Sequence, residues 1–170
     1  DDIEAKAAVK AAYEHEGPVY MRFGRLAVPI INDRPDYKFE IGKGVTLREG
    51  KDVAIIATGL CVSESLAAAE KLAADGIDVK VINIHTIKPL DEDLVVAAAK
   101  ECGKVVTVEE HSVIGGLGSA VCETLSRKAP TPVKTIGVQD CFGESGPAVA
   151  LLEKYGLNAE GIYASVKEFV

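Results

Sequence analysis

The chain contains no tryptophan and a single methionine, and aromatic residues make up only 5% of it. Proteins that stack nucleobases or sugar rings usually do so on several aromatic side chains, so we expect no such surface here. A basic stripe is also missing, because lysines and arginines are scattered and the net charge is −7. Negative charge disfavours contact with a phosphate backbone, so we expect no nucleic-acid partner.

Long apolar segments and paired cysteines are absent too. No apolar run approaches the roughly 20 residues of a membrane span, and the first residues do not resemble a signal peptide. We therefore expect a cytoplasmic protein with no membrane association. The cysteines show neither C-x-x-C pairing nor a histidine at metal-ligand spacing, which predicts reduced, mostly buried thiols and no metal site. They are Cys61, Cys102, Cys122 and Cys141.

The N-terminal part of the chain differs in pattern from the rest. Residues 3–15 are rich in Ala, Lys and Glu at helical spacing, and residues 19–23 have the composition of a strand. Residues 28–37 include two prolines among turn-forming residues, which favours an extended connector. We therefore predict that residues 1–34 are the tail of a preceding domain plus a linker, and that residues 35–170 form the main domain.

The main domain alternates expected strands with expected helices. This pattern predicts an α/β fold with a mainly parallel five-stranded sheet and helices on both faces. The first two strands are close in sequence, so we predict a hairpin that makes the first one an antiparallel edge. The expected strands are 45–48, 53–58, 79–84, 105–108 and 133–138, and the expected helices are 62–74, 92–101, 119–126, 147–155 and 159–169.

Three consecutive polar residues, Glu109, Glu110 and His111, follow the fourth expected strand. Open α/β sheets bind ligands at the carboxyl ends of their strands, so a carboxylate beside a histidine is a candidate proton-transfer pair. Neighbouring residues of an extended chain point in opposite directions, however. No nucleophile or metal ligand completes a site, which favours the alternative that Glu110 and His111 line a loop or an interface.

A glycine-rich turn, with Gly115, Gly116 and Gly118, comes next and opens a helix. Exposed amides at a helix N-terminus can hold an anion. The spacing does not fit a dinucleotide fingerprint, because Val121 stands where the third glycine belongs, and there is no Walker lysine. The alternative, which we favour, is close packing of the helix on the strand or a domain contact.

Two further segments contain residue types found in active sites. Residues 142–146 (FGESG) are one residue short of the G-x-S-x-G pattern, so a helix-capping turn explains them better than a serine hydrolase does. Arg22 and Arg25 flank Gly24 after the first expected strand. An arginine there can grip a phosphate through bidentate hydrogen bonds, although an isolated exposed arginine is more often only a solvated charge.

Taken in order, these segments resemble transketolase. The resemblance covers nearly the whole chain and corresponds to the end of the pyrimidine-binding domain plus the C-terminal domain. Two rival families share this domain type: the β subunits of 2-oxoacid dehydrogenases and 1-deoxyxylulose-5-phosphate synthase. A further alternative is a non-catalytic anion-binding or dimerisation module. Residues 84–91 and 142–146 fit transketolase best. The segments are 17–25, Gly59 after VAIIAT, 84–91, 108–111, 115–118 and 142–146.

The resemblance implies an enzyme of the pentose phosphate pathway that moves a two-carbon ketol unit between sugar phosphates. It implies thiamine diphosphate and Mg or Ca in the complete enzyme, with neither expected on this chain, and it implies no catalytic residue here. Arg25 falls where transketolases place an arginine that binds the substrate phosphate. The implied partners are the missing N-terminal domains or subunit, within a homodimer, so we expect the isolated chain to be inactive.

Overall fold

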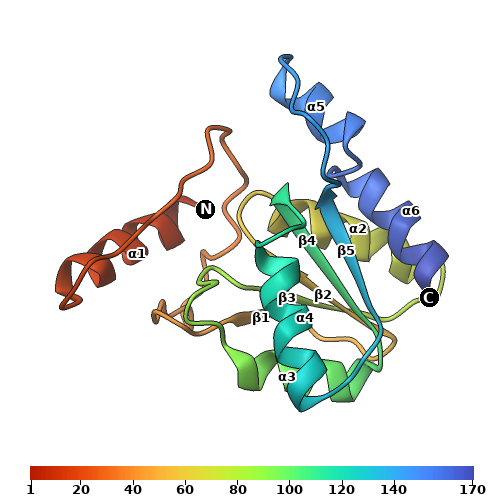
Figure 1. Ribbon diagram of the computed structural model, residues 1–170, viewed down its shortest axis with the longest axis horizontal. Coiled ribbons are helices and arrows are strands. Elements are labelled where there is room, and N and C mark those ends of the chain that lie inside the picture. Colours follow the sequence, from red (N-terminus) through yellow and green to blue (C-terminus); the bar gives the residue numbers. More distant parts are fainter.

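A computed structural model describes residues 1–170 as a five-stranded sheet with helices on both faces (Figure 1). This is the fold class that the strand and helix pattern predicts. The elements are α1 (Asp2–Glu14), β1 (Val45–Arg48), β2 (Val53–Ala57), α2 (Cys61–Ala74), β3 (Val79–Asn83), α3 (Glu92–Cys102), β4 (Val105–Ser112), α4 (Leu117–Lys128), β5 (Val133–Val138), α5 (Ala148–Lys154) and α6 (Ala159–Phe169). None of these helices combines the length and apolarity needed to cross a membrane.

The sheet has the order β1-β3-β2-β4-β5, and only β1 is antiparallel to its neighbour. Strand β2 shows why the sheet is covered on both faces, because all of its residues are fully buried. Val53 and Ile55 pack with residues of α2 and α6, whereas Ala54 and Ile56 pack with residues of α3 and α4. This alternation follows from the two-residue period of a strand.

Local sequence signals set both ends of helix α3. Asp91 caps α3 by accepting a hydrogen bond from the Leu94 amide, and its other oxygen accepts one from the amide of Gly44. Gly103 ends the same helix in the left-handed conformation, with φ of 69°. Both features agree with the predicted start and end of this helix.

The predicted hairpin between β1 and β2 is wrong, although β1 is indeed an antiparallel edge strand. Its partner is β3, with Val45 opposite Asn83. The intervening turn runs across the start of β3, where the amides of Lys51 and Asp52 donate to the carbonyl oxygen of Asp78. Gly50 passes so close to β3 that a Cβ atom would lie 2.2 Å from the Val79 carbonyl carbon. This crossing carries the chain from one neighbour of β3 to the other.

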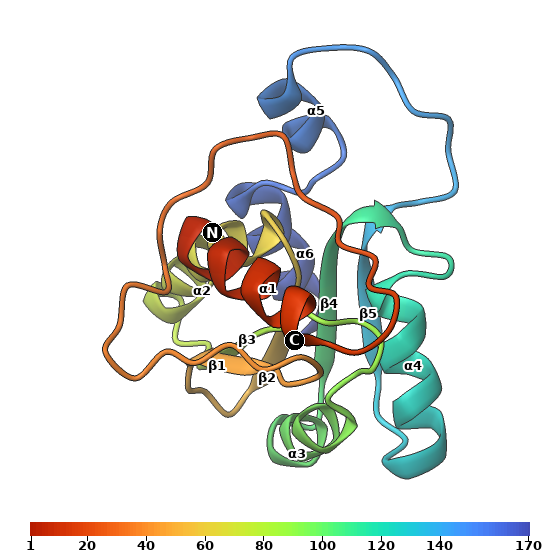
Figure 2. The same cartoon turned by 90° about the vertical axis from the view of Figure 1, so that its left-hand side faces the viewer.

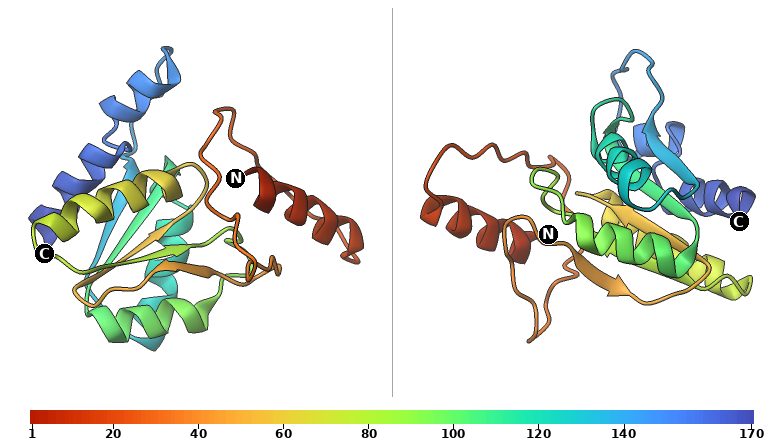
Figure 3. Two further views of the ribbon diagram at one scale, coloured as in Figure 1. Left: turned by 180° about the vertical axis from the view of Figure 1, so that it is seen from behind. Right: turned by 60° about the horizontal axis from the view of Figure 1, so that its bottom comes forward.

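The strand predicted at residues 19–23 does not form either. These residues carry no strand pairing and are exposed, including Tyr20 and Phe23. A strand needs a partner for its backbone groups, and no strand pairs with this segment. Helix α1 does form, but none of its residues is buried, and it lies apart from the sheet (Figure 3).

Strand β4 is longer than predicted, since it continues to Ser112, which pairs with Val138 after an irregularity. Glu109, Glu110 and His111 therefore belong to the strand itself, not to a loop. Pairing with β5 on both sides of the irregularity, at Val108 and at Ser112, holds the two ends of the segment that carries these three residues.

Candidate functional site

Two parts of the chain that are distant in sequence meet at the carboxyl end of the sheet. The connector between α1 and β1 passes the end of β4 (Figure 2), where Arg22 contacts Glu110. The carboxyl ends of parallel strands are the usual place for a ligand in this class of fold. We therefore take this edge as the candidate functional site.

Glu109 is the buried member of the site, with 1% of its surface exposed. Its two carboxylate oxygens accept hydrogen bonds from the amides of Leu117 and Gly118, each at 2.8 Å. These amides begin helix α4, where the helix dipole favours a negative charge. The anion at this helix N-terminus is thus the chain's own carboxylate, and an external anion cannot use these two amides.

The glycine turn makes room for Glu109. A Cβ atom on Gly116 would lie 2.0 Å from one Glu109 oxygen, and a Cβ on Gly118 would lie 3.0 Å from the Thr107 hydroxyl. The turn therefore serves close packing of helix on strand, the alternative favoured from the sequence. Gly115 has φ of 79°, and its amide donates to the Ser119 hydroxyl at 2.8 Å. A role of the turn in contacting another chain stays a prediction.

Glu110 points away from the core and is partly exposed. Its carbonyl oxygen accepts a hydrogen bond from Nη2 of Arg22 at 3.3 Å, and its carboxylate lies 3.8 Å from the same nitrogen. His111 is exposed, and its Nδ1 donates to the carbonyl oxygen of Ser112 at 2.9 Å. No hydrogen bond joins Glu110 to His111, so the structure does not assemble them into a proton-transfer pair.

Arg25, the predicted phosphate-binding residue, follows Arg22 by three residues and is exposed. Its guanidinium takes part in none of the hydrogen bonds or ion pairs of residues 1–170, in contrast to Arg22. An arginine without an internal partner keeps all five donors available for an external anion. The geometry is compatible with phosphate binding, which stays a prediction.

A polar cluster that sequence patterns did not reveal lies beside β3. One oxygen of Glu4 accepts hydrogen bonds from the Tyr37 hydroxyl at 2.9 Å and from Nδ2 of Asn83 at 2.7 Å. Asp1 accepts bonds from the amides of Ile31 and Asn32. Burial, followed by the neighbouring carboxylate, raises the pKa of the Tyr37 phenol. These contacts join α1 and the connector to the sheet domain, and no local pattern could show them because the partners are distant in sequence.

A histidine near this cluster is held by an aromatic ring. His85 stacks on Phe39 with 4.3 Å between ring centroids, and its Nδ1 lies 2.8 Å from the Thr86 hydroxyl. Burial lowers the pKa of His85, which favours the neutral ring. His85 was not among the site residues expected from the sequence, and the stacking indicates a structural role.

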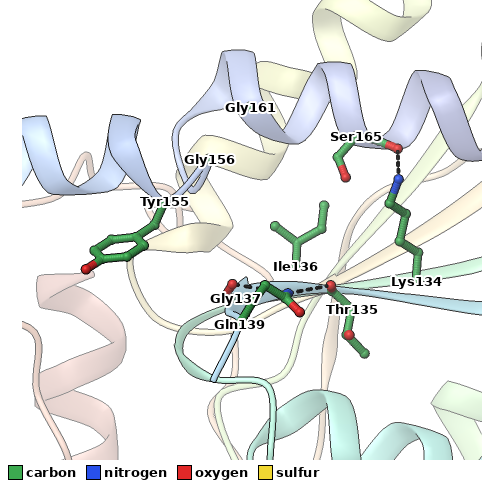
Figure 4. Close-up of a pocket in the computed structure, with 9 residues that line it drawn as sticks. All are labelled: Lys134, Thr135, Ile136, Gly137, Gln139, Tyr155, Gly156, Gly161 and Ser165. Carbon is green, nitrogen blue, oxygen red and sulfur yellow. Dashed lines mark hydrogen bonds between the residues drawn. The ribbon is translucent and has the colours of Figure 1, made fainter. Parts of the chain in front are cut away.

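A small cavity of about 330 Å³ lies elsewhere, between the edge strand β5 and helix α6 (Figure 4). The Gln139 amide donates to the carbonyl oxygens of Thr135 and Gly137, and Lys134 donates to the carbonyl oxygen of Ser165. These polar groups satisfy one another, and none of the expected site residues lines the cavity. Its lining residues are Lys134, Thr135, Ile136, Gly137, Gln139, Tyr155, Gly156, Gly161 and Ser165.

The cysteines and acidic residues form no metal site, since no group of three His, Cys, Asp or Glu side chains is placed to hold an ion. All four cysteines are free, and Cys61 and Cys102 are buried whereas Cys141 is exposed. Burial raises the pKa of the Cys61 thiol to about 12, so it stays protonated and unreactive near neutral pH.

The strand order, the antiparallel edge and the glycine turn packed on a buried glutamate define an α/β domain with a mainly parallel five-stranded sheet. The family described as "Transketolase, C-terminal domain" matches residues 42–162, so the chain belongs to this family. The resemblance inferred from the order of the segments is thereby confirmed.

Known relatives agree with this assignment. The 6-deoxy-6-sulfo-D-fructose transketolase subunit of Clostridium sp. (strain MSTE9) is 47% identical over 168 residues, which are 99% of this chain and 52% of that protein. A solved structure described as a split-gene transketolase, inactive β4 tetramer, has a TM-score of 0.90 and 53% identity, covering 96% of this chain and 53% of that one. The chain thus spans about half the length of these relatives.

A relative from one rival group is similar as well. The 1-deoxy-D-xylulose-5-phosphate synthase 1 of Geobacter sulfurreducens is 40% identical over 175 residues, which are 100% of this chain and 27% of that protein. The C-terminal domain is therefore common to both enzyme types, and it does not by itself separate them.

Proposed function

We propose that this chain is the C-terminal part of a transketolase that moves a two-carbon ketol unit between sugar phosphates. The observation that carries the proposal is the family match over residues 42–162, together with similarity over 99% of this chain to 52% of a transketolase subunit. The predicted division into a tail (1–34) and a main domain (35–170) fits this role. We also infer a cytoplasmic enzyme of the pentose phosphate pathway.

Within the proposed reaction, Arg25 binds the phosphate of the sugar. Its side chain is exposed and its guanidinium has no partner in the chain, whereas the charge of Arg22, three residues earlier, is offset by Glu110. A guanidinium matches the planar, bidentate geometry of phosphate oxygens better than an ammonium does. The same geometry accepts a sulfonate, the group named in the sugar of the Clostridium relative.

Thiamine diphosphate supplies the carbanion sink of the family's reaction. Residues 1–170 do not fit its metal-bound diphosphate, because they contain no cluster of three His, Cys, Asp or Glu side chains that could hold the ion. We propose that the cofactor and its Mg or Ca ion are held by the other half of the assembled protein, and that this chain contributes no catalytic residue.

The assembly requires a partner. We propose that the chain works with an N-terminal subunit or domain, and that two such units form a dimer. The relatives' names support this: one is a transketolase subunit, and the solved β4 tetramer is described as inactive. Exposed apolar side chains of α1 and the connector, such as Val9, Tyr20 and Phe23, offer surface for such a partner.

The test is an activity assay with and without the N-terminal half. The chain is extended by the rest of its pyrimidine-binding domain and co-expressed with the N-terminal subunit of a split transketolase, and ketol transfer is followed with thiamine diphosphate, Mg²⁺ and either a phosphorylated or a sulfonated ketose. We expect transfer by the complex and none by the isolated chain. Transfer by the isolated chain would contradict the proposal that the cofactor and the catalytic residues lie outside this chain.

The second candidate function is 1-deoxy-D-xylulose-5-phosphate synthesis, favoured by the 40% identity to that enzyme. The two reactions give different products, so product analysis of the assembled complex separates them. Formation of 1-deoxy-D-xylulose 5-phosphate without ketol transfer between sugar phosphates would replace the first proposal with the second.

A further inference from the structure

The connector reaches the end of β4 through a single arginine. Nη2 of Arg22 lies 3.3 Å from the carbonyl oxygen of Glu110 and 3.8 Å from its carboxylate, although the two residues are 88 positions apart. The flanking connector residues, from Val19 to Gly24, are exposed. Arg22 is therefore the point at which this stretch of the connector is held against the sheet.

The acceptor for Arg22 is fixed by the interior of the domain. Glu109, the preceding residue, is fully buried and accepts hydrogen bonds from the amides of Leu117 and Gly118. On the other side of Glu110, pairing with β5 resumes at Ser112, opposite Val138, after an irregularity in the register. The Glu110 carbonyl group lies between these two restraints and has little freedom to move. It is therefore a fixed hydrogen-bond acceptor for Arg22 of the connector.

Arg25 follows Arg22 by three residues and lacks any such support. Three extended residues span at most about 10 Å, so holding Arg22 confines Arg25 to the neighbourhood of Glu110. Gly24 lies between the two arginines with no atom near its Cβ direction, which leaves this backbone free to rotate. Without the Arg22 contact, the Arg25 guanidinium would have to be ordered at the moment of binding, which lowers affinity.

The charges divide between the two arginines in the same way. The Glu110 carboxylate lies near Arg22 and offsets its charge, whereas no acidic group pairs with Arg25. An exposed ion pair of this kind contributes little to folding stability. Its effect is thus expected in binding and not in unfolding.

We propose that Arg22 is a positioning residue for substrate recognition, and that Glu110 of the C-terminal domain acts through it. Together they hold the connector so that Arg25 meets the phosphate of the sugar. The proposal rests on the function proposed above. It gives the end of β4 a part in recognising phosphorylated substrates without contact to the reacting atoms.

The test uses the assembled, cofactor-loaded enzyme and four variants: Arg22→Ala, Arg22→Lys, Glu110→Gln and Arg25→Ala. For each we would measure KM and kcat with a phosphorylated acceptor, kcat/KM with an unphosphorylated acceptor, and inhibition by inorganic phosphate. Glu123→Gln, at an exposed position of α4 outside the site, is the matched control for loss of a surface charge.

Ordering one side chain changes affinity by about three- to ten-fold. Arg22→Ala should therefore raise both the KM for the phosphorylated acceptor and the phosphate inhibition constant by about that factor, with kcat within about two-fold. The unphosphorylated acceptor should be unaffected. Arg22→Lys should restore part of the loss, because an ammonium can still donate to the carbonyl oxygen, and Glu110→Gln should have a smaller effect because that carbonyl remains.

Other results would overturn the proposal. If Arg25→Ala weakens phosphate binding but Arg22→Ala does not, only the positioning role of Arg22 is wrong. If Arg22→Ala affects both acceptors equally, its role is general folding or assembly and not phosphate recognition. If the wild-type complex transfers no ketol unit, or if neither arginine variant changes the KM for the phosphorylated acceptor or the phosphate inhibition, then both the proposed function of this edge and the positioning role of Arg22 are wrong.

Discussion

The sheet and helix α1 are held in place by different forces. All residues of β2 and β3 are buried, whereas α1 has no buried residue and meets the rest of the chain through the carboxylates of Asp1 and Glu4. Apolar burial contributes about 25 cal/mol per Å², but a hydrogen bond at a partly exposed site contributes about 1 kcal/mol net. We therefore expect the sheet domain to fold by itself and α1 to depend on a partner for its full stability.

The largest contrast should come from shortening one apolar side chain in each region. Ile56→Ala opens a cavity at a fully buried position and should lower the free energy of unfolding by about 3 kcal/mol. Val9→Ala, on α1, removes a side chain that is 49% exposed and should change stability by less than about 0.5 kcal/mol. Urea unfolding measures both, and equal losses would show that α1 is packed in solution.

The buried carboxylate at the end of β4 should give the next largest effect. Glu109→Ala leaves the amides of Leu117 and Gly118 without an acceptor in the interior and should cost about 2–3 kcal/mol. Glu109→Gln keeps one oxygen and should cost less. The neighbouring Glu110→Gln is the control, and urea unfolding should show a change below about 0.5 kcal/mol there. A stable Glu109→Ala variant would mean that water reaches these amides.

A smaller effect is expected from adding a methyl group beside that carboxylate. The Cβ of Gly116→Ala would lie 2.0 Å from a Glu109 oxygen, so the turn has to shift, at a cost of about 1–2 kcal/mol. Gly143→Ala adds the same methyl group where no atom lies within 4 Å, and it should be neutral. Thermal unfolding measures the melting temperature of both variants. Equal melting temperatures would contradict the tight packing of the glycine turn.

The smallest effect concerns the polar contacts of α1. Tyr37→Phe removes one hydrogen bond to Glu4 and should cost about 1 kcal/mol or less, seen mainly as faster amide hydrogen exchange in α1. The pKa of Tyr37 is raised in the folded chain, so the folded state binds the phenolic proton more tightly than the unfolded state. This contribution is complete below pH ~10 and decreases above it.

The alkaline part of that prediction has its own measurement. Stability of the wild-type chain should decline more steeply above pH ~10 than that of Tyr37→Phe, which lacks the titrating group. Unchanged exchange in α1 together with identical pH profiles would show that the Glu4 cluster does not hold the helix.

Sequence reasoning found the residues of the candidate site but not their arrangement. Glu110 and Arg22 each stood out by their place after an apolar strand-like run, yet nothing in either segment indicated that they touch. Their contact depends on the path of a connector with no regular structure of its own. The Glu4 cluster was missed for the same reason, since its members come from three separate segments.

The sequence by itself determined the α/β class and the ends of the helix predicted at residues 92–101, because short-range periodicity and capping chemistry act within a few residues. The resemblance to transketolase came from the order of several short segments along the chain. Only the tertiary structure decided that β1 pairs with β3, that residues 19–23 form no strand, and that Glu109 occupies the N-terminus of α4. Each of these depends on which backbone groups find partners across long stretches of chain. That choice is made by packing and by the paths of the loops.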